Sequence, residues 1–280
     1  MPMGEMTVTL DDVACLTHLP IEGRMLDHGK KMPKHEGAAL LMTYLGVAQH
    51  EAEKICNQEY DGYISYPRLR DLYTTYLGRA NLLAGTEDPE ELARVRTYCV
   101  RCYLLYLVGC LLFGDRSNKR IELIYLTTMA DGYAGMRNYS WGGMTLAYLY
   151  GELADACRPG HRALGGSVTL LTAWFLAHFP GFFSVDLNTD YLENYPVAAR
   201  WKLQKGHGEG ITYRSLLDHI QLDDVFVDFR THTIKADDRD EQAGEDTWRV
   251  ADGYVLWYTR VSHPQIFPPL SGDLPRPANE

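Results

Sequence analysis

The chain has 280 residues, 46% of them apolar and 11% aromatic, which is enough to bury a sizeable core and excludes disorder over most of its length. Its 37 acidic and 27 basic residues give a formal charge of −10 with histidine neutral, which disfavours a protein that binds nucleic-acid phosphates. The charge is uneven, because residues 218–252 hold 11 acids and only four bases.

Helical periodicity and start signals predict most of the fold. The clearest helix begins at Asp88, with Pro89 at its first position and two acids in its first turn, and ends at Gly114. Residues 102–113 are apolar on every side, which predicts central burial. Further helices are predicted, in chain order, at residues 36–55, 65–83, 120–130, 140–158, 166–179, 196–205, 213–220 and 248–261.

Strand signals are sparse. Residues 6–9 and 225–229 alternate well enough to predict short strands, but no strand–helix–strand rhythm and no internal repeat occurs. We therefore expect a mainly α-helical single globular domain with a few short β-strands, in which the helices starting at Asp88, Ser140 and Gly166 form the core. This domain is predicted to span residues 1–263, with a helical core at about 36–220 and an acidic loop at about 235–246. Residues 264–280 are predicted to form an extended, proline-rich tail.

The cysteines indicate a reducing, intracellular environment. There are six of them, most in apolar stretches, and no signal peptide opens the chain. The one segment of membrane-like length is 163–185, which carries no formal charge. Glycines at its start, His178 and Pro180 leave about 14 residues of helix, so a buried core helix is favoured and no membrane partner is expected.

Three patterns could be mistaken for chemical sites. Cys99-x-x-Cys102 is half of a zinc or redox motif, but it lies mid-helix without a second pair, which favours core packing. The glycine-rich segment 206–210 lacks the preceding strand and the Gly-Lys-Ser/Thr ending of a phosphate loop, so it is interpreted as a connector. None of the eight lysines lies in the apolar context that a Schiff-base lysine requires.

The acidic pairs have structural interpretations that require no metal or catalysis. Thr9 and Asp12 fit a capping box at a helix start, and Asp223-Asp224 fits a turn. Residues 9–20 have the pattern of the first part of a helix-turn-helix motif, but no basic recognition helix follows. The sequence therefore predicts no catalytic residue, no cofactor and no metal ligand, and no catalytic triad can be argued from spacing.

Several segments in combination resemble the plant mobile domain over roughly residues 3–220. They include residues 4–14, Leu19-Pro20-Ile21-Glu22-Gly23, residues 103–113, Tyr139-Ser140-Trp141-Gly142-Gly143 with residues 146–153, and residues 165–174. Similar short stretches occur at 214–218 and 248–257. The chain departs from the family at 226–229, where Phe-Val-Asp-Phe replaces a Trp and a Pro-Tyr pair, and before the last helix, where the family has a longer segment. It also starts inside the first motif, as either a shortened form or a cut piece of a longer chain would.

This resemblance implies a domain found in plant transposable elements and in host proteins of the MAIN-like group. Those host proteins are nuclear, act in transposon silencing, gene expression and meristem maintenance, and work with a phosphatase-7-like partner. The family has no established active-site motif, and no residue here supports its "aminotransferase-like" label. Tyr139 and Trp141 are expected to be structural aromatics at a helix start.

The sequence thus favours a non-catalytic protein-interaction domain. A DNA-binding module of a mobile element and an enzyme of unknown reaction are the alternatives. Residues 218–252 and the proline-rich tail are the expected binding surfaces, while the partner-binding residues and the oligomeric state are left open.

Overall fold

The computed structural model describes residues 6–26, 32–59, 61–85, 88–117, 119–130, 133–160, 163–181, 185–202, 218–220 and 225. These residues are mainly helical, and they contain one two-stranded sheet, which confirms the predicted class. Contacts divide the chain into two compact units, one of Val8–Trp174 and one of Met1–Thr7 with Phe175–Glu280. The first unit holds almost all of the described structure.

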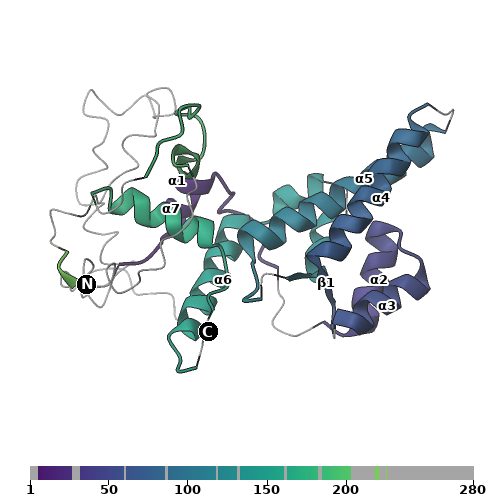
Figure 1. Cartoon of the computed structure of the whole chain (residues 1–280), viewed down its shortest axis with the longest axis horizontal. Helices are drawn as coiled ribbons and strands as arrows, with labels where there is room; N and C mark the ends of the chain where they lie inside the picture. The colour runs from purple at the N-terminus through teal and green to yellow at the C-terminus, as the bar shows by residue number, and fades with distance from the viewer. Residues whose placement is uncertain are drawn as a thin grey trace, which may run out of the picture. The chain divides into compact units, whose positions relative to one another are not determined.

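The longer helices are α1 (Leu10–Thr17), α2 (Lys34–Leu45), α3 (Gln49–Glu59), α4 (Tyr66–Leu83), α5 (Pro89–Leu107), α6 (Trp141–Ala156) and α7 (Val168–His178). Shorter turns are the π-helical η1 (Val108–Leu112) and the 3-10 helices η2 (Leu123–Met129), η3 (Ala134–Asn138) and η4 (Val197–Arg200). The strands are β1 (Tyr63–Ser65) and β2 (Arg120–Glu122), which pair antiparallel. Figure 1 labels most of these elements.

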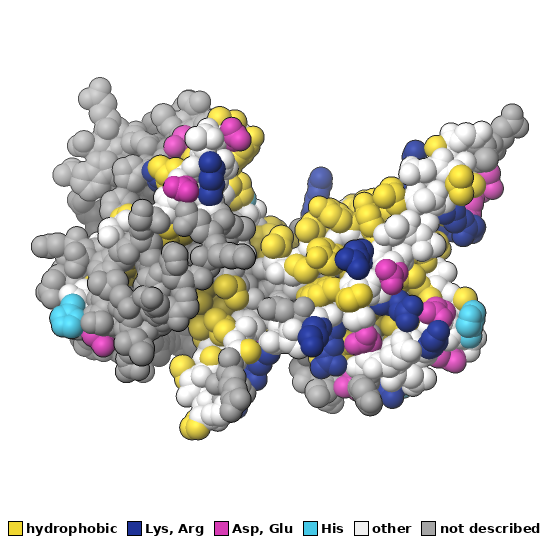
Figure 2. Space-filling view, viewed as in Figure 1, with side chains coloured by type: hydrophobic (Ala, Val, Ile, Leu, Met, Phe, Trp, Pro, Cys, Tyr) yellow, Lys and Arg dark blue, Asp and Glu magenta, His cyan; other side chains and the backbone are white. Residues whose placement is uncertain are grey.

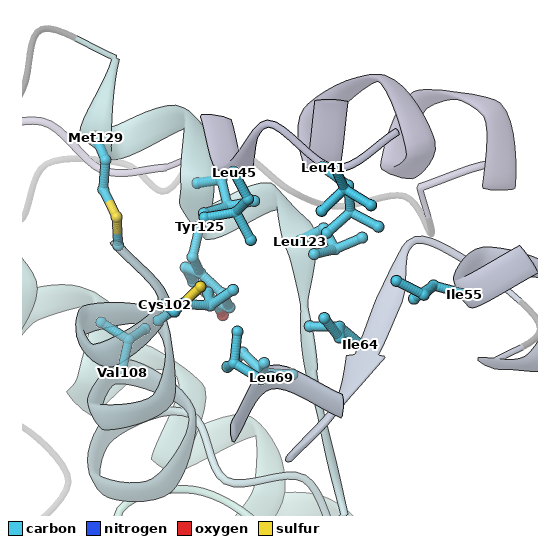
Figure 3. Close-up of a cluster of buried hydrophobic side chains, with 14 of the residues drawn as sticks. Leu41, Leu45, Ile55, Ile64, Leu69, Cys102, Val108, Leu123, Tyr125 and Met129 are labelled. Carbon is cyan, nitrogen blue, oxygen red and sulfur yellow. The ribbon is translucent and has the colours of Figure 1, made fainter. Parts of the chain in front are cut away.

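Helices α4 and α5 form an antiparallel hairpin, beside which α2 and α3 pack (Figure 1). The core lies where α5 meets α2, α4 and η2, and Figure 3 shows its side chains converging from all of these elements. Leu45, Leu69 and Leu105 are fully buried there. Each such side chain contributes about 1.5–3 kcal/mol by leaving water.

Local start signals are confirmed where a side chain caps a helix. Asp88 accepts a hydrogen bond from the Glu91 amide at 2.9 Å at the start of α5. Ser140 caps α6 through the Gly143 amide at 3.3 Å. The helices predicted to start at residues 65, 88, 140 and 166 all form. The last of them is α7, which begins two residues after Gly166.

The predicted helix at 36–55 is wrong as one element, because it is two helices. Gly46 adopts a left-handed φ of 64° and ends α2, while its amide donates to the Met42 carbonyl at 3.1 Å. A Cβ at Gly46 would lie 2.5 Å from the Tyr98 ring, so glycine is required by packing as well as by backbone conformation.

The prediction of a helix over 120–130 is only partly confirmed. Arg120–Glu122 forms strand β2, and only Leu123–Met129 is helical, as a 3-10 helix. Pairing with β1 places Ile121 opposite Ile64, and both side chains are buried. This long-range contact overrides the local helical pattern.

The predicted strand at 6–9 is also wrong. Thr9 caps α1, with its amide donating to Asp12 Oδ2 at 2.8 Å and its Oγ1 accepting from the Asp12 amide at 3.2 Å, so the predicted capping box is confirmed. The Val8 carbonyl accepts a hydrogen bond from the Tyr150 hydroxyl instead of from a strand.

Several predictions fall at or beyond the limits of the described residues. Val225 is in no strand, and of the predicted helix at 196–205 the described part forms only the short η4. Outside the described residues lie 203–217, 221–224 and 226–280, which include the glycine-rich segment, Asp223-Asp224, the acidic loop, the last predicted helix and the proline-rich tail.

Helix α7 has 11 residues, too short to cross a bilayer, as expected for segment 163–185. Among the described residues, the continuous helix Pro89–Leu112 is the one long and apolar enough to do so by composition. Its hydropathy is also that of a core helix, and it packs along α4 with Arg101 hydrogen-bonded in its middle. Only 33% of its most apolar window is buried, so core packing accounts for part of this composition and exposed residues carry the rest.

Two of the segments that carry the family resemblance, 19–23 and 139–143, lie against each other. The Ser140 hydroxyl donates to the Ile21 carbonyl at 2.7 Å, and the Gly142 amide donates to the Pro20 carbonyl at 2.8 Å. These contacts join residues nearly 120 positions apart in sequence to the start of α6.

Gly23 is the most constrained residue of this junction. Its φ is +118°, and a Cβ there would lie 2.7 Å from the Asn138 carbonyl oxygen. That carbonyl already accepts the Arg24 amide at 2.8 Å, so it cannot move away without losing the bond. Only glycine fits this position.

We predict that Gly23→Ala lowers the free energy of unfolding by about 1–3 kcal/mol, because strain and the clash act together. The matched control is Gly78→Ala, since Gly78 lies inside α4 with no atom near its Cβ position. That substitution is expected to raise stability by about 0.5–1 kcal/mol. Urea unfolding of both variants checks the pair, and equal effects would contradict the assignment.

Candidate interaction surface

The two cysteines that form half of a metal or redox motif in the sequence are part of the hydrophobic core. Cys99 and Cys102 are buried in the core, and burial raises the pKa of both thiols, that of Cys102 to about 12. A thiol with such a pKa is neutral at physiological pH and is a poor nucleophile or ligand. No group of three or more potential metal-binding side chains occurs among the described residues.

Tyr139 and Trp141 stand at the start of α6, as expected. Trp141 is 6% exposed, and its indole nitrogen donates to the Met136 carbonyl at 2.8 Å. The Tyr139 ring carries the Arg24 guanidinium 4.9 Å from its centroid. Both aromatic residues hold the α6 junction together, which is a structural role.

A different group of aromatic residues is exposed, on the α4–α5 hairpin. Along α4, Tyr66, Arg70, Tyr73 and Leu77 follow one another at spacings of three and four and so share one side of the helix. Leu77 is 40% exposed, and the two tyrosines are half-buried.

Along α5, Arg96, Val100, Tyr103 and Tyr106 form a second row. Tyr103 is 50% exposed, and Val100 and Tyr106 are each 39% exposed. The two rows meet, because the Tyr73 and Tyr103 ring centroids are 6.1 Å apart. We call these eight residues of α4 and α5 the tyrosine face.

The tyrosine face continues past α5 into the π-helical turn η1. Tyr66 and Tyr106 pack edge to face, with centroids 5.5 Å apart. Cys110 and Leu111, in η1, are both exposed beyond them. In Figure 2, hydrophobic side chains gather over the region where Figure 1 shows α4 and α5, with basic side chains among them. A π-turn is unusual within a helix and is often found at functional sites.

The charge of the tyrosine face comes from its two arginines. Burial raises the pKa of Tyr66, and a hydrogen bond to the Cys110 side chain raises that of Tyr106, so these phenols stay neutral at physiological pH. Neither helix contributes a carboxylate to the face. Beyond the two helices, the Asp115 carboxylate acts on Tyr66 at one end of the face, where it also pairs with Arg120 at 3.5 Å. The rest of the face is apolar, with positive charge from Arg70 and Arg96.

These two arginines differ from their neighbours. On the same hairpin Arg68 pairs with Glu51, and Arg79 and Arg94 both pair with Glu91. No ion pair with a described carboxylate is formed by Arg70 or Arg96. Arg68, Arg79 and Arg94 are thus held by carboxylates, whereas the charges of Arg70 and Arg96 stay on the tyrosine face.

Sequence reasoning missed this surface. Because residues 102–113 are apolar on all sides, central burial was predicted for all of them, and that prediction is wrong for Tyr103, Tyr106 and Leu111. The signal that was present is the tyrosine content of the segment, since tyrosine joins an apolar ring to a polar tip and is enriched at interfaces.

The fold and this surface together define a mainly helical domain with an exposed aromatic face. The plant mobile domain family model matches residues 1–257, and the chain belongs to that family. The match spans both compact units. No solved structure matches the chain.

Three proteins of Arabidopsis thaliana are similar to the chain. Protein MAINTENANCE OF MERISTEMS is 26% identical over 80% of this chain and 43% of its own length. Protein MAIN-LIKE 2 is 29% identical over 80% of this chain and 31% of its own length. A serine/threonine-protein phosphatase 7 long form homolog is 29% identical over 75% of this chain and 15% of its own length. The chain thus spans less than half of each of these relatives.

The exposure of η1 yields a prediction about thiol reactivity. We expect iodoacetamide to modify the exposed Cys110 and Cys157 in the native chain, and to modify Cys102 only after unfolding, because the Cys102 thiol is buried and protonated. Mass spectrometry of proteolytic peptides locates each label. Cys110→Ser is the control that leaves Cys157 labelling unchanged. Protection of Cys110 in the native monomer would show that this end of the tyrosine face is covered.

Proposed function

We propose that this chain is a non-catalytic, nuclear protein-interaction domain of mobile-element origin, acting in transposable-element silencing, gene-expression regulation and meristem maintenance together with a phosphatase-7-like partner. The observation that carries the interaction role is the tyrosine face. Family membership and the relatives support its setting.

The tyrosine face has the composition of a binding surface. Tyrosine and arginine are enriched among the residues that dominate binding energy at interfaces. A tyrosine ring brings a large apolar area and loses little conformational entropy on binding, because it has two side-chain torsions. Exposed rings on a rigid helical hairpin are therefore well prepared for a partner.

The names of the relatives support the proposed biological role and the proposed partner. One similar protein is named for the maintenance of meristems, and another is named as a phosphatase 7 long form homolog. In the second, a stretch resembling this chain occupies 15% of a much longer polypeptide. A domain of this type in a chain named for a phosphatase supports a working relation between the two.

The DNA-binding alternative has weaker physical support. Most affinity for DNA comes from basic side chains free to contact phosphates. Among the described arginines, six are engaged in ion pairs with carboxylates: Arg68, Arg79, Arg94, Arg116, Arg120 and Arg158. Half of the twelve described arginines are thus held by carboxylates, which lowers the positive charge available to a phosphate backbone.

Affinity purification from plant nuclei with the whole chain as bait tests the proposal. We expect recovery of a phosphatase-7-like protein, and a loss of at least about tenfold with Tyr103→Ala, because tyrosine is enriched among the hot-spot residues whose truncation costs about 2 kcal/mol or more. Tyr195→Ala is the matched control, since Tyr195 is 42% exposed and lies outside the tyrosine face.

Circular dichroism confirms that both variants are folded before capture. Undiminished capture by Tyr103→Ala would remove the tyrosine face from the interaction. Recovery of no phosphatase-like protein by the unaltered chain would refute the partner, and retardation of duplex DNA at low salt would favour the DNA-binding alternative.

A further inference from the structure

We propose that the tyrosine face binds one amphipathic α-helix of a partner protein, whose acidic side chains meet Arg70 and Arg96. This inference rests on the proposed interaction function and adds to it the chemistry of the partner segment. Three properties of the face support it: the two rows of side chains that lie side by side, the length of the face and its excess of positive charge.

The two rows favour a helix over other partner shapes. Helices α4 and α5 run antiparallel, and each presents one row at spacings of three and four. A third helix can pack along two such rows, as helices do in bundles, with its own ridge of side chains between them. An extended strand gains no backbone hydrogen bonds here, because the helices of the hairpin already satisfy theirs.

The length of the face sets the length of the partner helix. From Tyr66 to Leu77 the α4 row extends about 16 Å at 1.5 Å per residue. Contacts along this distance require three turns of helix, or about 11 residues, with apolar side chains at positions i, i+3, i+4 and i+7. Tyr73 of one row and Tyr103 of the other, with ring centroids 6.1 Å apart, are where the rows meet and provide the central anchor.

The charge of the face selects the partner's sign. Arg70 lies on α4 and Arg96 on α5, so positive charge flanks the rings from both helices, and neither helix offers a carboxylate there. Arg68 and Arg79, also on α4, already have carboxylate partners. A bound helix with glutamate or aspartate along both edges would supply the pairs that no described carboxylate makes with Arg70 and Arg96. Partial exclusion of water would strengthen these pairs.

A second copy of this chain fits the face less well. Two tyrosine faces in contact would bring together four arginines and no carboxylate from either hairpin. Like charges brought together at an interface cost free energy, and a self-complementary surface carries both signs. The same charge that attracts an acidic helix thus opposes pairing of two copies.

The test places a photo-crosslinking amino acid, p-benzoylphenylalanine, at position 103 of the whole chain, which is then incubated in plant nuclear extract and irradiated. Mass spectrometry identifies the crosslinked segment. We expect a segment of about 11–18 residues with helical apolar spacing and a net negative charge. The same probe at Tyr195 is the control and should not crosslink to that segment.

Charge reversal provides the second arm of the test. Arg70→Glu with Arg96→Glu should lower the crosslink yield at position 103 at least about fivefold, whereas Arg137→Glu, an exposed arginine outside the face, should leave it unchanged. The yield for the unaltered chain should also fall at high salt, because exposed ion pairs are screened.

The outcomes separate this inference from the proposed function. Co-purification of a partner without a crosslink at 103, or a crosslink to a basic segment, an extended segment or a second copy, would overturn the acidic-helix inference and leave the interaction function standing. An unchanged yield after charge reversal would overturn it as well. If no partner co-purifies at all, the proposed function fails and this inference fails with it.

Discussion

The guanidinium of Arg101 fixes how α5 is rotated within the core. Its Nη1 donates to the Tyr44 carbonyl and its Nη2 to the Met129 carbonyl, each at 3.0 Å, so one side chain links the ends of α2 and η2 to the middle of α5. A planar fork with two donors can satisfy both carbonyls at once, which a lysine cannot do. Each bond to a charged group contributes about 1.5–3 kcal/mol. Because Arg101 and Tyr103 are about 160° apart around the helix, anchoring the first directs the second toward solvent.

The sequence was most informative where a local interaction decides the structure. The caps at Thr9, Asp88 and Ser140 act within three residues, and all three helices begin as predicted. It was least informative where distant segments decide, as in the pairing of β1 with β2. The exposed side of α5 is a case of the second kind, since a helix apolar all round carries no pattern that says which side other helices will cover.

The segments through which the chain resembles its family have two roles, which are holding the fold together and forming the exposed surface. Residues 19–23 and 139–143 hold the start of α6 through Gly23 and Ser140, and their requirements are steric and hydrogen-bonding ones. Segment 103–113 has both roles, because Leu105 is in the core while Tyr103 is half exposed. A surface placed on a core helix inherits the rigidity of the core, which lowers the entropy lost when a partner binds.

The net charge of −10 does not argue against an acidic partner. Charges beyond a Debye length, about 8 Å at physiological ionic strength, are largely screened, so the pairs formed at contact dominate the electrostatics of a bound helix. Within the tyrosine face those contacts are Arg70 and Arg96. Of the other arginines of the hairpin outside the core, Arg68 pairs with Glu51, and Arg79 and Arg94 share Glu91. Long-range repulsion by the acidic chain would slow the approach of an acidic helix more than it would weaken the complex, because steering acts mainly on the association rate. The local arrangement of arginines with and without a described carboxylate partner therefore decides which partner the face accepts.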